Sequence, residues 1–108
     1  MNNIITNNTE KCEKAADGLY HVYDPEIGLN VVDLGLIYQV DFNEEGKQIY
    51  CEMTLTTQFC PMGDSITSNV TESLKESYPG WEVELNLTFD PPWDYSKISP
   101  RGNEFLGR

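Results

Sequence analysis

The sequence predicts an α+β protein, a single two-layer sandwich in which helices pack on a short three-stranded sheet. Three observations predict this fold. The length of 108 residues suits one domain. Apolar residues make up 39% of the chain, which is enough for a core. Segments of helical and strand periodicity follow one another in the order α-β-β-α-β, with an irregular C-terminal tail. We expect residues 1–8 to be disordered and residues 9–108 to form the domain, tail included.

The first helix is predicted from Thr9 to about Tyr23, with Thr9 as its N-cap. Apolar side chains recur on one side of it at spacings of three and four: Cys12, Ala15, Ala16, Leu19 and Val22. Asp24-Pro25 ends this helix, because the residue before a proline is pushed out of the helical region. Residues 24–35 then form a loop with apolar anchors.

Two strands joined by a turn follow this loop. Residues 36–42 alternate, and their predicted apolar face is Leu36, Tyr38, Val40 and Phe42. Residues 43–46, Asn-Glu-Glu-Gly, supply a turn, and residues 49–55 alternate again. The two strands are therefore expected to form a hairpin.

A second helix and a third strand complete the pattern. The helix opens at Cys60-Pro61 and runs to about Tyr78, and Pro79-Gly80 stops it. Its apolar residues recur every four positions: Met62, Ile66, Val70, Leu74 and Tyr78. Residues 82–89 alternate without interruption, which predicts the last strand.

The charge excludes several classes of function. Eighteen acidic residues stand against seven basic ones, and the net charge is −11. Binding to nucleic acid or to an anionic membrane requires clustered Lys and Arg, which the sequence lacks. No apolar run approaches the roughly 20 residues that cross a bilayer. The first ten residues show no signal-peptide pattern, so we expect a soluble, cytoplasmic protein.

Three cysteines, Cys12, Cys51 and Cys60, have no zinc-site spacing. The periodicity places Cys12 and Cys51 in the core. Cys60 precedes a proline at the first helical position, which would make it the N-cap, where unpaired N–H groups favour the thiolate. A thiolate is a nucleophile and a ligand for soft metals, and Thr56 and Thr57 could place hydroxyl groups around it. The alternative is that Cys60 is a small buried hydrophobic residue.

Acidic residues in the loop are further candidates. Asp24 and Glu26 flank Pro25 and are either two convergent carboxylates or a helix-type cap. Asp33 lies within an apolar run, so its carboxylate needs hydrogen bonds or a charged partner; the simpler interpretation is a loop-ordering turn.

The stiff segment Pro91-Pro92-Trp93 directly follows the last strand. It either folds back over the sheet edge or forms a docking surface for another protein.

Taken together, DPEIGLNVVDLGLIY (residues 24–38), MTLTTQFCP (53–61) and FDPPWDYSKIS (89–99) resemble the iron–sulfur cluster assembly domain family, which includes PaaD-like and SufT-like proteins. The resemblance covers about residues 12–108, and EFLG near the end of the chain is similar to the family's closing segment. One departure is Gln58-Phe59, where many members have Pro-Gly.

The resemblance implies an α+β fold and a role in maturing iron–sulfur proteins. It implies that Cys60 is the reactive position and a transient thiolate ligand of metal. It also implies that Asp24, Glu26, Thr56 and Thr57 line one shallow site, while Asp33 keeps a structural role in its loop.

Stable cluster binding needs about four soft ligands, so one thiol implies a cluster or iron held only transiently, by a homodimer or together with a partner or a small thiol. The expected partners are the assembly machinery and client proteins, with no nucleic acid and no membrane. The alternative is a PaaD-like adaptor subunit without catalysis. A thiol enzyme ranks last because the single histidine, His21, lies 39 positions from Cys60.

Overall fold

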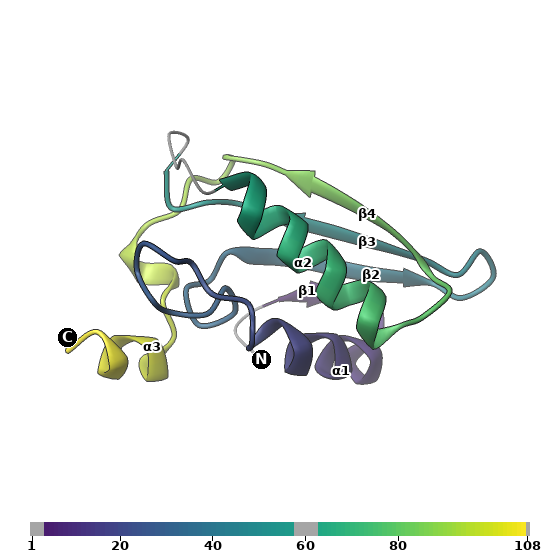
Figure 1. Cartoon of the computed structure of the whole chain (residues 1–108), viewed down its shortest axis with the longest axis horizontal. Coiled ribbons are helices and arrows are strands. Elements are labelled where there is room, and N and C mark those ends of the chain that lie inside the picture. Colours follow the sequence, from purple (N-terminus) through teal and green to yellow (C-terminus); the bar gives the residue numbers. More distant parts are fainter. Residues whose placement is uncertain (1–3, 58–62, 108) are drawn as a thin grey trace.

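The computed structural model describes residues 4–57 and 63–107, which form a four-stranded sheet with helices on one of its faces (Figure 1). The elements along the chain are β1 (Ile5–Thr6), α1 (Thr9–Leu19), β2 (Ile37–Asn43), β3 (Gln48–Met53), α2 (Gly63–Ser77), β4 (Glu82–Leu87), a short 3₁₀ helix η1 (Tyr95–Lys97) and α3 (Pro100–Phe105). The α+β class predicted from the sequence is confirmed. No helix in residues 4–57 and 63–107 is long and apolar enough to span a membrane.

The sheet differs from the predicted one in its number of strands. Its strand order is β1-β2-β3-β4; β2 and β3 form the expected antiparallel hairpin, and the two outer pairs are parallel. The prediction of three strands was wrong because β1 adds a fourth. The tail was expected to be irregular and instead contains η1 and α3.

The fourth strand lies in the segment that was expected to be disordered. Asn7 fixes it to β2: its side-chain amide donates to the Phe42 carbonyl at 3.0 Å, and its Oδ1 accepts from the Phe42 N–H at 2.9 Å. A strand of two residues has no periodicity to detect. Its pairing with Gln39 and Val40 of β2, and the contact of Asn7 with Phe42, 35 positions away, are tertiary contacts that local sequence does not show.

Helix α1 is shorter than predicted and is capped by a different residue. Asn8, not Thr9, is the N-cap, and its side chain accepts from the Lys11 N–H at 3.1 Å. The helix ends at Leu19 instead of near Tyr23. Its buried stripe contains four of the five predicted residues, Cys12, Ala15, Ala16 and Leu19, whereas Val22 is buried beyond the end of the helix.

A β-bulge in β2 changes which side chains face the core. Ile37 pairs with Met53 and Gln39 with Glu52, so Tyr38 is the extra residue between two ladder positions. The strict alternation predicted for residues 36–42 therefore fails at Tyr38, which is only half-buried. Val40 and Phe42 face the core as predicted.

Helix α2 covers the sheet with the predicted stripe. Ile66, Val70 and Leu74 are buried, and Tyr78 is buried just beyond the helix. The predicted beginning of this helix, at Cys60 and Pro61, and Met62 of its stripe lie outside the described residues. The opposite face of the sheet is not covered by a helix in the described ranges (Figure 1) and carries half-exposed and exposed polar side chains.

Candidate functional site

Three segments that are distant in the sequence meet at one end of the sheet: residues 24–38, 53–57 and 89–99. They are joined by hydrogen bonds from Thr54 N–H to Leu36 C=O (2.8 Å), Trp93 Nε1–H to Leu34 C=O (2.6 Å), Ser99 Oγ–H to Asp33 Oδ1 (2.7 Å) and Tyr38 O–H to Pro91 C=O (2.8 Å). Figure 1 shows the loop after α1 and the tail before α3 together at this end. The segments that carry the sequence motifs therefore form one structural unit, which we call the motif end.

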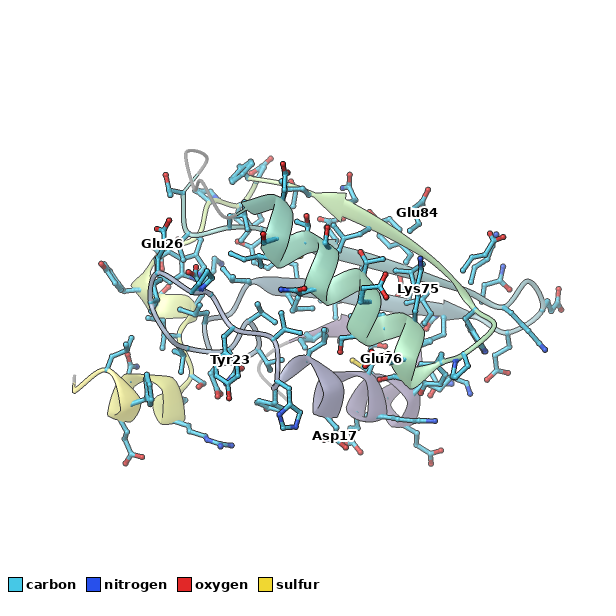
Figure 2. The ribbon with its side chains drawn as sticks, in the orientation of Figure 1. Asp17, Tyr23, Glu26, Lys75, Glu76 and Glu84 are labelled. Atoms are coloured by element: carbon cyan, nitrogen blue, oxygen red, sulfur yellow. The ribbon has the colours of Figure 1, made fainter. Side chains whose placement is uncertain are left out.

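Asp24 organises a tight turn in the loop after α1. It is buried, and its Oδ1 accepts from the Glu26 N–H at 2.9 Å, while its carbonyl accepts from the Gly28 N–H at 2.7 Å. Gly28 has a φ of +82°, which favours glycine. These bonds form a turn and not the helix-type cap of the sequence prediction, because no helix begins at Asp24. Glu26 is exposed at the same end of the molecule (Figure 2), so the two carboxylates have different surroundings.

Asp33 is buried at the centre of the contact between the loop and the tail. Its two carboxylate oxygens accept from Ser99 Oγ at 2.7 Å and from the Asn30 side-chain amide at 2.7 Å. Ser99 also caps α3, because its Oγ accepts from the Gly102 N–H at 2.9 Å. The carboxylate thus finds the hydrogen bonds that its apolar surroundings require, and it connects the loop to α3.

The tail crosses the loop as a strap, which we define as residues 90–99. Trp93 is half-buried against the core, and its indole N–H binds the loop backbone. Gly35 permits the close crossing: its φ is +78°, and a Cβ there would lie 2.2 Å from the Lys97 carbonyl oxygen. Pro91 and Pro92 are exposed. The segment Pro91-Pro92-Trp93 therefore combines an exposed part with an anchored aromatic residue.

Tyr38 and Thr54 belong to this end of the sheet, and the sequence did not single them out as site residues. Thr54 is fully buried just after β3, and its hydroxyl donates to the Leu55 carbonyl at 3.4 Å. Burial raises the pKa of Tyr38, and the neighbouring Thr54 side chain partly opposes that rise. The Lys97 ammonium group lies 5.2 Å from the centre of the Tyr38 ring. Strict alternation assigned this side chain to the core, because the residues around Tyr38 do not indicate the bulge that interrupts the strand there.

Thr56 and Thr57 lie beyond Thr54 and Leu55 in the segment after β3, and they are half-buried and exposed, respectively. Cys60, the predicted reactive thiol, lies outside the described residues, as do Gln58 and Phe59. The described residues that flank this segment are close together, since a Cβ on Gly63 would lie 2.8 Å from a methyl group of Leu55. The end of β3 and the first described turn of α2 therefore meet at the motif end.

The other two cysteines lie in the core. Cys12 is 1% exposed and Cys51 is 0% exposed, and both are free thiols. Burial raises the pKa of Cys51 to about 12 and also raises the pKa of Cys12. Both thiols are therefore protonated and shielded at neutral pH, and neither is available as a nucleophile or as a metal ligand.

The described residues contain no group of three or more His, Cys, Asp or Glu side chains placed to hold a metal ion. The motif end instead offers a buried carboxylate that is already hydrogen-bonded, an exposed carboxylate, and hydroxyl groups on Thr56 and Thr57. These described groups do not form a closed metal site.

The sequence matches a family model described as "Iron-sulfur cluster assembly protein" over residues 13–85. It is 35% identical, over 88% of this chain and 92% of the relative, to a Bacillus subtilis (strain 168) protein described as "Fe-S protein maturation auxiliary factor YitW". It is 38% identical, over 80% of this chain and 97% of the relative, to "Fe-S protein maturation auxiliary factor SufT" of Staphylococcus aureus (strain USA300).

The fold is similar to that of a solved structure from Bacillus anthracis, titled as a domain of unknown function, DUF59. The TM-score is 0.84 and the sequences are 34% identical, with 92% of this chain and 93% of that chain covered. The arrangement of strands and helices described above is therefore also that of a known structure.

Proposed function

The chain belongs to the iron–sulfur cluster assembly protein family, and from this premise we propose that it is an auxiliary factor in the maturation of iron–sulfur proteins. In this role the chain receives iron or a cluster as cargo and passes it to client proteins, with Cys60 as a transient thiolate ligand. Two relatives that carry the name of maturation auxiliary factors support the proposal. The partners that it requires are the assembly machinery and those clients.

The observation that carries the proposal is the convergence of the three motif segments on the motif end. Hydrogen bonds hold residues 24–38 and 89–99 together there, next to the end of β3. Cys60 follows Thr56 and Thr57 in the sequence and precedes α2, so its two described flanks belong to this same end. Glu26 and the two threonines are the described side chains that we propose to line the path of the cargo.

The burial of the other thiols limits how a cluster can be held. Cys12 and Cys51 are inside the core, so Cys60 is the one thiol of this chain that remains as a candidate ligand. A cluster generally takes about four soft ligands, and the remaining ligands must therefore come from a second copy, a partner or a small thiol. A cluster that this chain ligates through one thiol is not enclosed by the chain, and such incomplete ligation favours its transfer to a client protein.

Anaerobic reconstitution with iron and sulfide tests the proposal. We expect wild-type protein, mixed with a small thiol, to develop the visible absorption of a cluster and Cys60→Ser to lose it. Cys12→Ala is the matched control, because it also removes a thiol but leaves the proposed ligand in place. Equal absorption in wild type and Cys60→Ser would contradict the ligand role.

An adaptor without metal binding is the second candidate, and the exposure of the strap favours it. Pro91 and Pro92 are exposed, and Tyr95 is 59% exposed beside Trp93, with the two ring centres 5.3 Å apart. Trp93→Ala would also remove the indole bond to Leu34, so Tyr95→Ala is the cleaner surface variant. Partners that co-purify with Cys60→Ser but not with Tyr95→Ala would favour the adaptor.

A further inference from the structure

The strand β4 forms one edge of the sheet, and its outer side has no strand partner in the described part of the chain. At its two ends, the Glu82 N–H donates to the Lys47 carbonyl at 2.9 Å and the Thr88 N–H donates to the Met53 carbonyl at 2.8 Å. Alternate residues of a strand direct their backbone groups to opposite sides. Val83, Leu85 and Leu87 therefore direct their N–H and C=O groups away from β3, as a template for a further strand.

The two faces beside this edge differ in character. Glu82 and Glu84 are exposed on the face that no described helix covers, and Figure 2 shows Glu84 at the margin of the sheet opposite α1. On the helical side, Leu87 is 41% exposed and Leu85 is half-buried. No Lys or Arg occurs in β4.

A hollow of about 320 Å³ lies between α2 and the β4 edge. It is lined by Thr67, Ser68, Thr71, Glu72 and Leu85. A side chain from an added strand, pointing to the helical side, would enter this hollow. Its neighbours along that strand would point to the other side, toward Glu82 and Glu84.

We propose that the β4 edge binds an extended segment of a partner protein in which basic residues alternate with small apolar residues. Backbone hydrogen bonds to Val83, Leu85 and Leu87 supply affinity, and the alternating side chains supply specificity. The basic side chains lie against Glu82 and Glu84, and the apolar side chains lie over Leu85 and Leu87.

Charge favours this partner over a second copy of the chain. A second copy would bring a net charge of −11 to the edge, together with its own Glu82 and Glu84, whereas a basic segment brings the opposite charge. The inference concerns β4 and α2 alone. It stands whether or not Cys60 binds iron or a cluster.

Titration with the fluorescein-labelled peptide Lys-Val-Lys-Val-Lys-Val-Lys tests the proposal by fluorescence anisotropy. We expect the double variant Glu82→Lys/Glu84→Lys to bind about tenfold more weakly than wild type, because two charge contacts become repulsive. The control Glu13→Lys/Glu45→Lys makes the same change in net charge at exposed positions outside β4, and it should bind within about twofold of wild type. Equal weakening of both variants would overturn the proposal.

Amide hydrogen exchange gives the residue-level signature. The peptide should protect the amides of Val83, Leu85 and Leu87, while those of Glu82, Glu84 and Asn86 are already protected by β3. A Lys-Pro-Lys-Pro-Lys-Pro-Lys peptide carries the same charge but cannot add a strand. Equal binding of this peptide would overturn the proposal. So would a peptide-free dimer in light scattering whose three edge amides are already protected.

Discussion

Single residues at the motif end have roles that depend on burial. Asp33 shows how far local sequence leads: its apolar neighbours predict that the carboxylate must find hydrogen bonds. The sequence could not predict that Ser99, 66 positions away, supplies one of them. In the same way, Asp24 was compatible with a helix-type cap and with a pair of convergent carboxylates, and its bond to the Glu26 N–H instead orders a turn in which no helix begins.

Thiol reactivity should separate Cys60 from the other two cysteines. Because Cys12 and Cys51 are shielded and their pKa values are raised by burial, native protein treated with iodoacetamide at pH 7.5 should be labelled about once per chain, at Cys60. Intact mass measures the stoichiometry, and unfolded protein should take up three labels. Labelling of Cys60→Ser to the same extent as wild type would contradict this expectation.

The buried thiol of Cys51 should make stability sensitive to alkali. Below pH 9.0 the thiol is protonated in both the folded and the unfolded chain. Between 9.0 and about 12 only the folded chain keeps the proton, so the free energy of unfolding falls as the pH rises. Urea titrations across this range should show a shallower fall in Cys51→Ala. Parallel pH profiles for wild type and Cys51→Ala would show that the Cys51 thiol does not cause the fall in the free energy of unfolding.

The Asp33–Ser99 contact should contribute measurably to stability. Ser99→Ala removes a hydrogen bond to a buried carboxylate and the cap of α3, and we expect a loss of about 1–3 kcal/mol in the free energy of unfolding. Urea denaturation measures this loss. Ser96→Ala, which removes an exposed hydroxyl bonded to Asp94, is the control and should cost less than about 1 kcal/mol. Equal losses of unfolding free energy in Ser99→Ala and Ser96→Ala would mean that the buried position of the Asp33–Ser99 contact contributes no extra stability.

Whole elements were predictable where a period extends over several turns or pleats. The stripe of α2 and the alternation of β4 have this property, and both elements are present. The elements that were missed are short or irregular: β1 has two residues, and the bulge in β2 interrupts a period that otherwise continues. The loop and the strap have no period, so their crossing at Gly35 follows only from tertiary contacts.

That crossing predicts an unequal response of two glycines with similar backbone conformation. Gly35→Ala must displace the Lys97 carbonyl and should cost at least about 3 kcal/mol. Gly28 has a φ of +82°, but a Cβ there meets nothing within 4 Å, so Gly28→Ala should cost only about 1 kcal/mol. Thermal or urea unfolding of both variants makes the comparison. Equal costs would show that the close approach of the strap is not required.

The net negative charge of the whole molecule destabilises the compact folded state, because its acidic side chains repel one another. The net charge is −11. In the described part of the chain, Glu44 forms an ion pair with Lys11 at 3.4 Å. Self-repulsion should weaken as salt screens it, so raising NaCl from about 0.02 M to about 0.3 M should raise Tm by about 2–5 °C. Differential scanning calorimetry measures this shift. The less acidic Glu82→Lys/Glu84→Lys variant should show a smaller rise, and a Tm that falls with salt would contradict the explanation.

The strap also affects the order in which the chain can complete its fold during synthesis. Residues 4–87 contain the whole sheet and the two helices that cover it, yet Trp93 and Ser99, which anchor the loop, are made later. We therefore expect a nascent chain to assemble its core first and to leave the loop around Asp33 open until the strap leaves the ribosome. The end of the sheet where cargo is proposed to bind would then mature last, so that only a chain synthesised past Ser99 could present it.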